Sequence, residues 1–153
     1  MAEPTVLKNC YLAFTTSTAS TTYVEVPGLK TISWTLAKAE LANGVMGDVA
    51  EPFHPGLISL PIEITTRQDF TTTVAATSGA DKLFYNLWAN ETKFTIKTRA
   101  VDAAVSGTNP SYKFTPVRVF SLTPIDGSHG ALLEQKVSIR PASTFALTRS
   151  TST

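Results

Sequence analysis

The chain has few of the features that would cross-link it through disulfides or anchor it in a membrane. It contains one cysteine, Cys10, so no disulfide can form within it, and we expect this thiol to be a small apolar side chain of a first strand. No run approaches the roughly 20 apolar residues that a membrane-spanning helix needs. The N-terminus also lacks a basic stretch followed by an apolar segment. We therefore expect folding in a cytoplasm and no membrane insertion by this chain.

The chain also carries little charge. Charged residues make up 16% of the sequence, below the roughly 25% of typical soluble domains, and the formal net charge is +1. Such a surface favours association over mutual repulsion and is poorly suited to a solitary monomer. A net charge of +1 also argues against a DNA reader, so we interpret the cationic row of Lys93, Lys97 and Arg99 as a solvated or intersubunit strand face.

Metal-ligand patterns are missing. Neither His54 nor His129 has a second histidine or cysteine at ligand spacing. Asp48, Glu51 and His54 are three residues apart, but proline at positions 52 and 55 opposes the helix that would bring these side chains together. We expect no metal and no cofactor.

Catalytic motifs are missing as well. Asp126, Ser128 and His129 match a triad in composition only, because residues adjacent in sequence seldom reach the required geometry. We interpret this segment as a glycine-bounded turn. The sequence has no P-loop, dinucleotide fingerprint or nucleophile elbow. We therefore expect no catalytic residues and no enzymatic activity.

The sequence does contain a series of β-strand patterns. In residues 57–65 the side chains of Ile58, Leu60, Ile62 and Ile64 fall on one face, which predicts a strand in a sheet with one dry face. Comparable patterns predict strands at 6–14, 22–26, 30–36, 69–76, 93–101, 112–122 and 133–140. Strands are therefore expected to be the main secondary structure of the chain.

Turn and bulge signals connect the predicted strands. The short link at 66–68 predicts antiparallel pairing of the strands on either side of it, and Pro27 with Gly28 predicts a hairpin-type turn. Around Pro116 the apolar residues switch from one face of the predicted strand to the other. This switch predicts a bulge or bend, since proline cannot donate a backbone hydrogen bond to the neighbouring strand. The polar end of the chain, residues 143–153, is expected to be a flexible tail that orders only against a neighbour.

One helix is predicted at residues 79–90. Ser78 is placed to cap it, and Asp81 lies in its first turn, where a carboxylate suits the helix dipole. An apolar stripe is formed by Leu83, Phe84, Leu87 and Trp88, which we interpret as a seam facing the core. The fold class that results is all-β with one α-helix, as an antiparallel β-barrel or sandwich, and the length of 153 residues suits one domain at 1–153.

A long segment at 37–56 shows neither the sustained hydrophobic spacing of a helix nor that of a strand. Structureless loops of that length are uncommon in a compact domain unless they have a function. Its apolar side chains need a surface to cover them, and we expect another copy of the protein to supply it; they are Leu41, Val45, Met46 and Phe53.

The order of these elements, with a Val26-Pro27-Gly28-Leu29-Lys30 turn segment and a Gly44-Val45-Met46-Gly47 loop core, resembles that of the major tail tube protein of contractile-tailed bacteriophages. The resemblance covers about residues 7–139. It implies a β-barrel or sandwich protomer that forms hexameric rings, which stack into a hollow tube through which DNA passes. The loop at 37–56 would then reach the adjacent ring. The inter-ring contacts proposed on this basis are Glu40, Leu41, Asn43, Val45, Met46, Asp48, Glu51 and Phe53.

The resemblance also implies partners and a location. The partners would be further copies of the chain, the tail sheath, the tail terminator, the baseplate hub and the tape measure protein, with non-specific passage of DNA. The location would be the virion tail, assembled in the cytoplasm of a bacterial host. Two alternatives remain: the tube of a related injection device, such as a tailocin or secretion tube, and a β-sandwich carbohydrate-binding module with Trp34, Tyr112 and Trp88 as stacking platforms.

Overall fold

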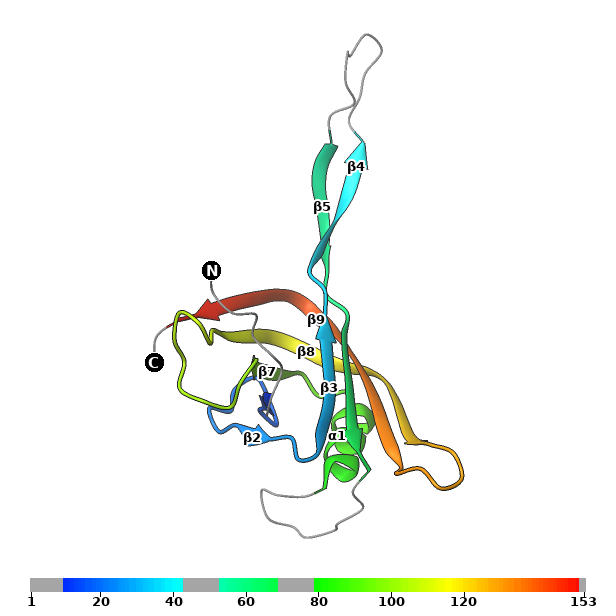
Figure 1. The fold of residues 1–153 in the computed structure, drawn as a ribbon. Coiled ribbons are helices and arrows are strands. Elements are labelled where there is room, and N and C mark those ends of the chain that lie inside the picture. The colour runs from blue at the N-terminus through cyan, green and yellow to red at the C-terminus, as the bar shows by residue number, and fades with distance from the viewer. Residues whose placement is uncertain (1–9, 43–52, 69–78, 152–153) are drawn as a thin grey trace.

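The computed structural model describes residues 10–42, 53–68 and 79–151. Figure 1 shows a rolled β-sheet with a helix against it and a long hairpin that stands away from it. The elements in chain order are β1 (Tyr11–Phe14), β2 (Val24–Glu25), β3 (Leu29–Trp34), β4 (Ala37–Ala42), β5 (Phe53–Ser59), β6 (Ile62–Arg67), α1 (Ala80–Ala89), β7 (Phe94–Arg99), β8 (Ser111–Asp126) and β9 (Glu134–Ser150).

Within the described residues, the strands form two antiparallel sheets. The larger has seven strands in the order β2-β1-β7-β8-β9-β6-β3, and the smaller contains β4 and β5. The predicted fold class is confirmed, with a rolled sheet that does not close into a barrel. Pro27 and Gly28 do form a turn, with Gly28 at φ 66°, but it joins β2 to β3 at opposite edges of the sheet and makes no hairpin.

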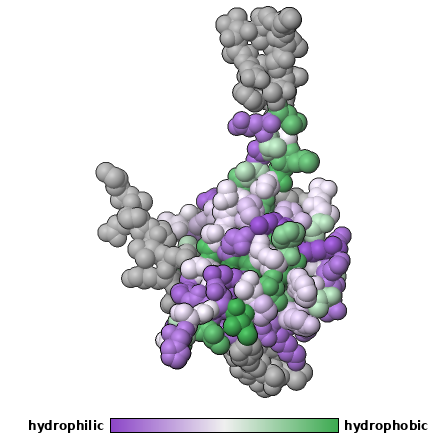
Figure 2. Space-filling model, turned by 90° about the vertical axis from the view of Figure 1, so that its right-hand side faces the viewer, coloured by the Kyte–Doolittle hydropathy of each residue, from purple (hydrophilic) through white to green (hydrophobic). Residues whose placement is uncertain are grey.

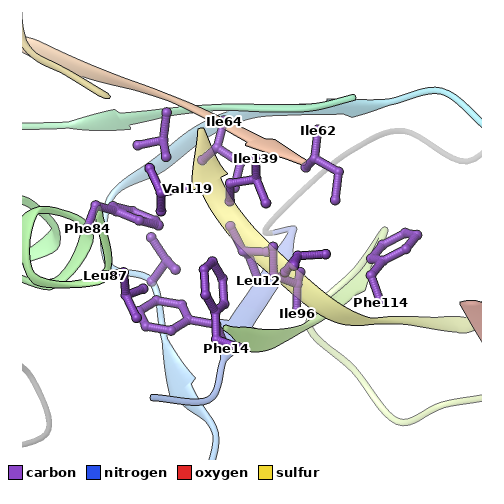
Figure 3. Packing of buried hydrophobic residues seen from close by; sticks show 14 of the residues in the cluster. Leu12, Phe14, Ile62, Ile64, Phe84, Leu87, Ile96, Phe114, Val119 and Ile139 are labelled. Carbon is purple, nitrogen blue, oxygen red and sulfur yellow. The ribbon is translucent and has the colours of Figure 1, made fainter. Parts of the chain in front are cut away.

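The core lies inside the roll of the sheet, under α1 (Figure 3). Phe84 and Leu87 of α1 are buried there, and the Phe14 ring lies 5.6 Å from Phe84 and 5.9 Å from Phe94. Burying each such side chain contributes about 1.5–3 kcal/mol. Other fully buried members are Leu12, Leu60, Ile62, Ile64, Ile96, Phe114, Val117 and Ile139. The predicted apolar stripe of the helix is therefore confirmed for its central residues, while Trp88 remains 45% exposed.

A polar network fixes the first turn of α1 to the sheet. The carboxylate of Asp81 accepts hydrogen bonds from Nε2 of Gln68 at 3.0 Å and from Nε2 of Gln135 at 3.3 Å. Gln135 is fully buried, and its Oε1 faces the hydroxyl of Thr66 at 3.5 Å. The helix N-cap is Gly79, which offers no side-chain hydrogen bond, and the predicted cap Ser78 lies outside the described residues. Asp81 thus connects the helix to β9 and to the residue that follows β6.

The predicted strand at 57–65 is wrong as a single element. Pro61 lacks an amide hydrogen and ends the pairing, so β5 and β6 on either side of it belong to different sheets. Leu60, Ile62 and Ile64 are buried as predicted, whereas Ile58 is exposed. The predicted pairing with residues 69–76 is also wrong, because β6 already pairs with β3 on one side and β9 on the other. Residues 69–76 themselves lie outside the described residues.

Two segments predicted to lack structure contain strands. The expected loop at 37–56 includes β4 and most of β5, with residues 43–52 outside the described range. The expected flexible tail at 143–153 forms the last part of β9 as far as Ser150. Here β9 pairs with β8, for example Leu147 opposite Phe114, and Leu147 packs against the core. A partner strand more than 25 residues away in sequence supplies this order, which local polarity does not reveal.

The remaining strand predictions agree with the structure in the described regions. Phe94 and Ile96 share the buried face of β7, and the register of β8 shifts between Thr115 and Val117, which places the predicted bulge at Pro116. The predicted first strand at 6–14 is observed as β1, and residues 6–9 lie outside the described range.

The Asp81→Ala variant is expected to lose about 1–3 kcal/mol of unfolding free energy, because it leaves the amide of Gln135 buried without its acceptor. Urea denaturation followed by circular dichroism measures the loss. Lys82→Ala, at the exposed neighbouring position, is the matched control and should change stability by less than about 0.5 kcal/mol. Equal stability of the two variants would contradict the anchoring role of Asp81.

Candidate assembly surfaces

The β4–β5 hairpin extends the β3–β6 ladder beyond the body of the molecule (Figure 1). Trp34 pairs with Ile62 at the end of the body ladder, and Ala37 pairs with Ser59 at the start of the hairpin. Gly56 permits the two strands to approach closely, since a Cβ there would lie 3.1 Å from the carbonyl oxygen of Ala39. The hairpin therefore continues a supported ladder beyond the core, and its base lines an open cavity of about 470 Å³ shared with residues 141–144 of β9.

Aliphatic side chains on this hairpin are left uncovered. Leu57 is 88% exposed, Leu41 is 55% exposed and Ile58 is 46% exposed. Figure 2 shows hydrophobic surface along the stem of the hairpin. Clustered exposed apolar surface of this kind marks an interaction site, whereas isolated exposed residues do not.

The structure positions three of the predicted contact residues. Glu40 and Leu41 lie on β4 and are exposed, and Phe53 begins β5 opposite Ala42. The others lie outside the described residues: Asn43, Val45, Met46, Asp48 and Glu51. Sequence reasoning missed Leu57 and Ile58, which it assigned to a core strand. The proline at position 61 was the available signal that the core strand starts after it.

Sheet edges remain unpaired in the described part of the chain. In the described residues, β3 pairs only with β6, and β1 pairs with β2 only at Ala13 and Phe14. Residues 146–149 of β9 pair only with β8. Between the first two edges lies an open cavity of about 220 Å³ lined by residues that include Cys10, Ile32 and Trp34. Burial raises the pKa of the Cys10 thiol, and a hydrogen bond with Thr98 partly opposes this rise. Exposed edges of this kind are templates for pairing with another chain.

The outer face of β3, β6, β9 and β8 is mainly polar, with the 69% exposed ring of Phe120 lying under Arg140 as an apolar exception. The strand registers align two rows across the four strands: Ser33, Glu63, Ser138 and Ser121 in one, and Thr31, Thr65, Lys136 and Thr123 in the other. The side chains of these rows alternate with the buried residues of the core. The result is a broad hydrophilic surface backed by a dry interior.

Cations on this polar face are held next to carboxylates of the same chain. Arg140 lies 3.0 Å from Glu63, and Arg118 lies 3.9 Å from Glu91 at the end of α1. Two further pairs join Lys30 to Glu134 and Lys136 to Asp126. The hydrogen bond and charge of Asp126 raise the pKa of Lys136. Such exposed pairs contribute little stability, but they neutralise the face locally.

The predicted cationic row on β7 is divided between different environments. Lys93 is exposed, whereas Lys97 lies 5.6 Å above the Tyr23 ring and Arg99 lies 4.0 Å above the Tyr11 ring. Arg99 also pairs with Asp102 at 3.2 Å. Lys97 and Arg99 are thus engaged by aromatic rings of their own chain, which the strand pattern alone did not indicate.

The alternative site candidates are not brought together. Asp126, a member of the triad-like segment, forms an ion pair with Lys136. The described residues contain no group of three potential metal ligands. Trp34 packs 5.1 Å from Tyr112 and 5.1 Å from Phe114 at the edge of the core, while Trp88 lies beside Tyr85 at 6.2 Å. No helix within the described ranges is long and apolar enough to cross a membrane.

The whole fold is similar to those of tail tubes. It matches the SPP1 tail tube with a TM-score of 0.71 at 10% identity, over 97% of this chain and 80% of that one. It matches a chain of an extracellular contractile injection system, the PVC sheath–tube complex in the extended state, with a TM-score of 0.59 at 12% identity, over 97% and 92% of the two chains.

A third match is to the tail of an empty GTA particle refined with C6 symmetry, with a TM-score of 0.59 at 14% identity, over 90% of this chain and 95% of that one. These matches confirm, at the level of the fold, the resemblance predicted from the sequence. No protein-family model matches the sequence, and no curated protein matches it significantly.

Proposed function

We propose that this chain is the structural protomer of a hollow tail tube, built from rings of six copies that stack along one axis. The observation that carries the proposal is the projecting hairpin with uncovered aliphatic side chains, on a fold similar to those of tail tubes. The six-fold ring is supported by the C6 symmetry of the matched GTA tail. The role is mechanical and needs no catalytic group.

Ring closure would use the unpaired sheet edges. β3 of one copy would lie against β1 or the end of β9 of the next, so that backbone groups left open in one chain are satisfied by its neighbour. A contact between two different edges repeats around a ring and closes when the rotation per copy divides a full turn. The low net charge of +1 opposes this association little.

Stacking would use the hairpin. Leu41, Leu57 and Ile58 would be covered by the next ring, with Glu40 at the polar rim. The other residues proposed to contact the next ring are Asn43, Val45, Met46, Asp48, Glu51 and Phe53. Burial of apolar side chains at the centre of the contact would supply most of the affinity.

The polar face of β3, β6, β9 and β8 is the proposed wall of the lumen. Its two aligned rows consist of hydroxyl-bearing and charged side chains. The cations that Glu63, Glu134 and Asp126 hold in ion pairs would bind phosphate weakly, whereas Arg67 of β6 has no carboxylate partner in the described residues. This arrangement favours non-specific passage of DNA. A tube that conducts another cargo in a phage-derived injection device is the alternative.

The proposed setting is a virion tail assembled in a bacterial host. The partners would be a sheath, a tail terminator, a baseplate hub and a tape measure protein. The matched chain from a sheath–tube complex supports a surrounding sheath. A carbohydrate-binding role has less support, because Trp34 and Tyr112 pack on one another and against the core.

The Leu57→Glu variant is expected to remain folded and to form no tubes, since a charge on the exposed stem of the hairpin cannot be buried at a contact. Negative-stain electron microscopy at concentrations where the wild-type chain forms tubes of uniform diameter gives the readout. Ala104→Glu, in an exposed loop, is the control and should assemble normally. Deleting residues 42–48 should act like Leu57→Glu. Long tubes from either hairpin variant would refute the stacking role.

A double variant, Glu63→Gln with Asp126→Asn, is expected to form tubes that bind short duplex DNA several-fold more tightly at low salt. It releases Arg140 and Lys136 from their carboxylates on the proposed lumen face. Its DNA binding should also fall more steeply with added salt, because more phosphates are contacted. Asp102→Asn, which frees Arg99 away from this face, is the control. Unchanged DNA binding by the double variant, or an equal gain in DNA binding by the control, would count against the polar face as the wall of the lumen.

A further inference from the structure

We propose that the turn between β8 and β9 is the surface that receives the hairpin of a second copy in the next ring. This inference rests on the proposed tube and adds the partner surface that the hairpin needs. The receiving surface consists of Ile125, Leu132 and Leu133 together with the cleft beside them. It would make the contact between rings heterologous, with a different surface on each side.

The receiving surface is apolar and uncovered. Leu132 is 71% exposed and Ile125 is 62% exposed, and Leu133 is also exposed. These three residues flank one turn, so their side chains form a second exposed aliphatic group in addition to that of the hairpin. Leu133 lies at the start of the strand predicted at 133–140, and it is 43% exposed, whereas Gln135 two residues later is buried.

The two surfaces lie at opposite ends of the molecule. In Figure 1 the hairpin projects at the top, while the β8–β9 turn lies at the lower end beyond the body of the sheet. A chain with complementary surfaces at opposite ends associates head to tail, and this association continues without limit along an axis. Stacked rings require such an arrangement, because the hairpins of each ring must meet the opposite end of the next.

A cleft beside the turn offers a place for the hairpin stem. Its volume is about 580 Å³, and it is lined by Gly28, Leu29, Lys30, Arg67, Ala131, Leu132 and Glu134. Leu132 belongs to both the cleft and the exposed aliphatic group, so the two are continuous. The cleft combines apolar walls with charged residues at its rim, as protein interfaces commonly do.

Charge complementarity favours the hairpin as the occupant. Arg67 is exposed at the cleft, and no carboxylate among the described residues pairs with it, whereas its neighbour Lys30 is paired with Glu134. Glu40 on the hairpin is exposed and likewise has no cationic partner in the described part of the chain. A contact that buries Leu57 and Leu41 against Leu132 would therefore also bring an unpaired anion toward an unpaired cation.

The test uses two full-length variants that each lose one side of the contact. Leu57→Glu removes the hairpin side, and a double variant, Ile125→Glu with Leu132→Glu, removes the receiving side. Each variant is purified as rings, and mass photometry compares each alone with their equal mixture. We expect each variant alone to remain as single rings. We expect the mixture to form pairs of rings, with twice the mass of one ring, and no stacks of three or more rings. In the mixture, one intact hairpin surface meets one intact receiving surface, and both outer ends are blocked.

Charge reversal tests specificity at the same contact. Arg67→Glu should raise the concentration needed for tube formation about tenfold, and adding Glu40→Arg in the same chain should restore it. Ala104→Glu is again the control and should leave tube formation unchanged. All variants are checked for wild-type thermal unfolding, so that loss of assembly is not loss of folding.

Three results would overturn the inference. These are wild-type tubes from the double variant at the turn, a mixture whose mass does not double, or no rescue by the paired charge reversal. In each case wild-type tubes would still form, and the proposed function would stand with a different receiving surface. Failure of the wild-type chain to form tubes would instead overturn the proposed function itself.

Discussion

The antiparallel ladder between β3 and β6 supports both the core and the surface through which the molecule is proposed to assemble. Along the body, this ladder places Ile62 and Ile64 in the buried core cluster inside the rolled sheet. On the other side of Pro61 the same two chain segments form β5 and β4, which project beyond the body and leave Leu41 and Leu57 exposed. Because β3 and β6 are fixed by the core, the β4–β5 hairpin projects from a defined position and in a defined direction.

The need for a partner follows from the same geometry. Backbone groups at the edges of β3, β1 and β9 and aliphatic side chains on the hairpin are left exposed. In a solitary chain they are contacted by water, and their burial in an assembly would release apolar surface from water. Low net charge, open edges and an uncovered hairpin therefore act in the same direction. The polar face presents hydroxyl groups and ion pairs that water can solvate, so most of it has no such requirement.

Much of the fold could be predicted from the sequence, because a helix or strand that is buried on one face has apolar residues at a regular spacing. The helix was identified from the spacing of Phe84 and Leu87, and the interior strands from pairs such as Phe94 and Ile96. The alternation that includes Ile58 gave a wrong boundary, since periodicity records which side chains share a face and not whether a body lies under them. The end of β9 was missed because it buries little beyond Leu147 and depends on β8 for its order. The candidate site was predicted only in part: the hairpin segment was identified, but Leu57, the polar face and the receiving turn depend on long-range pairing that local patterns do not contain.

Backbone hydrogen exchange in the hairpin strands tests the central claim most directly. The amides of residues 37–42 and 53–59 are measured in dilute protein and in assembled protein, with the core strand β7 as internal reference. The account predicts fast exchange in the dilute chain and strong protection in the assembly, while β7 is protected in both. Equal exchange of the hairpin amides in dilute and concentrated protein would contradict it, because the hairpin would then not be covered by another copy.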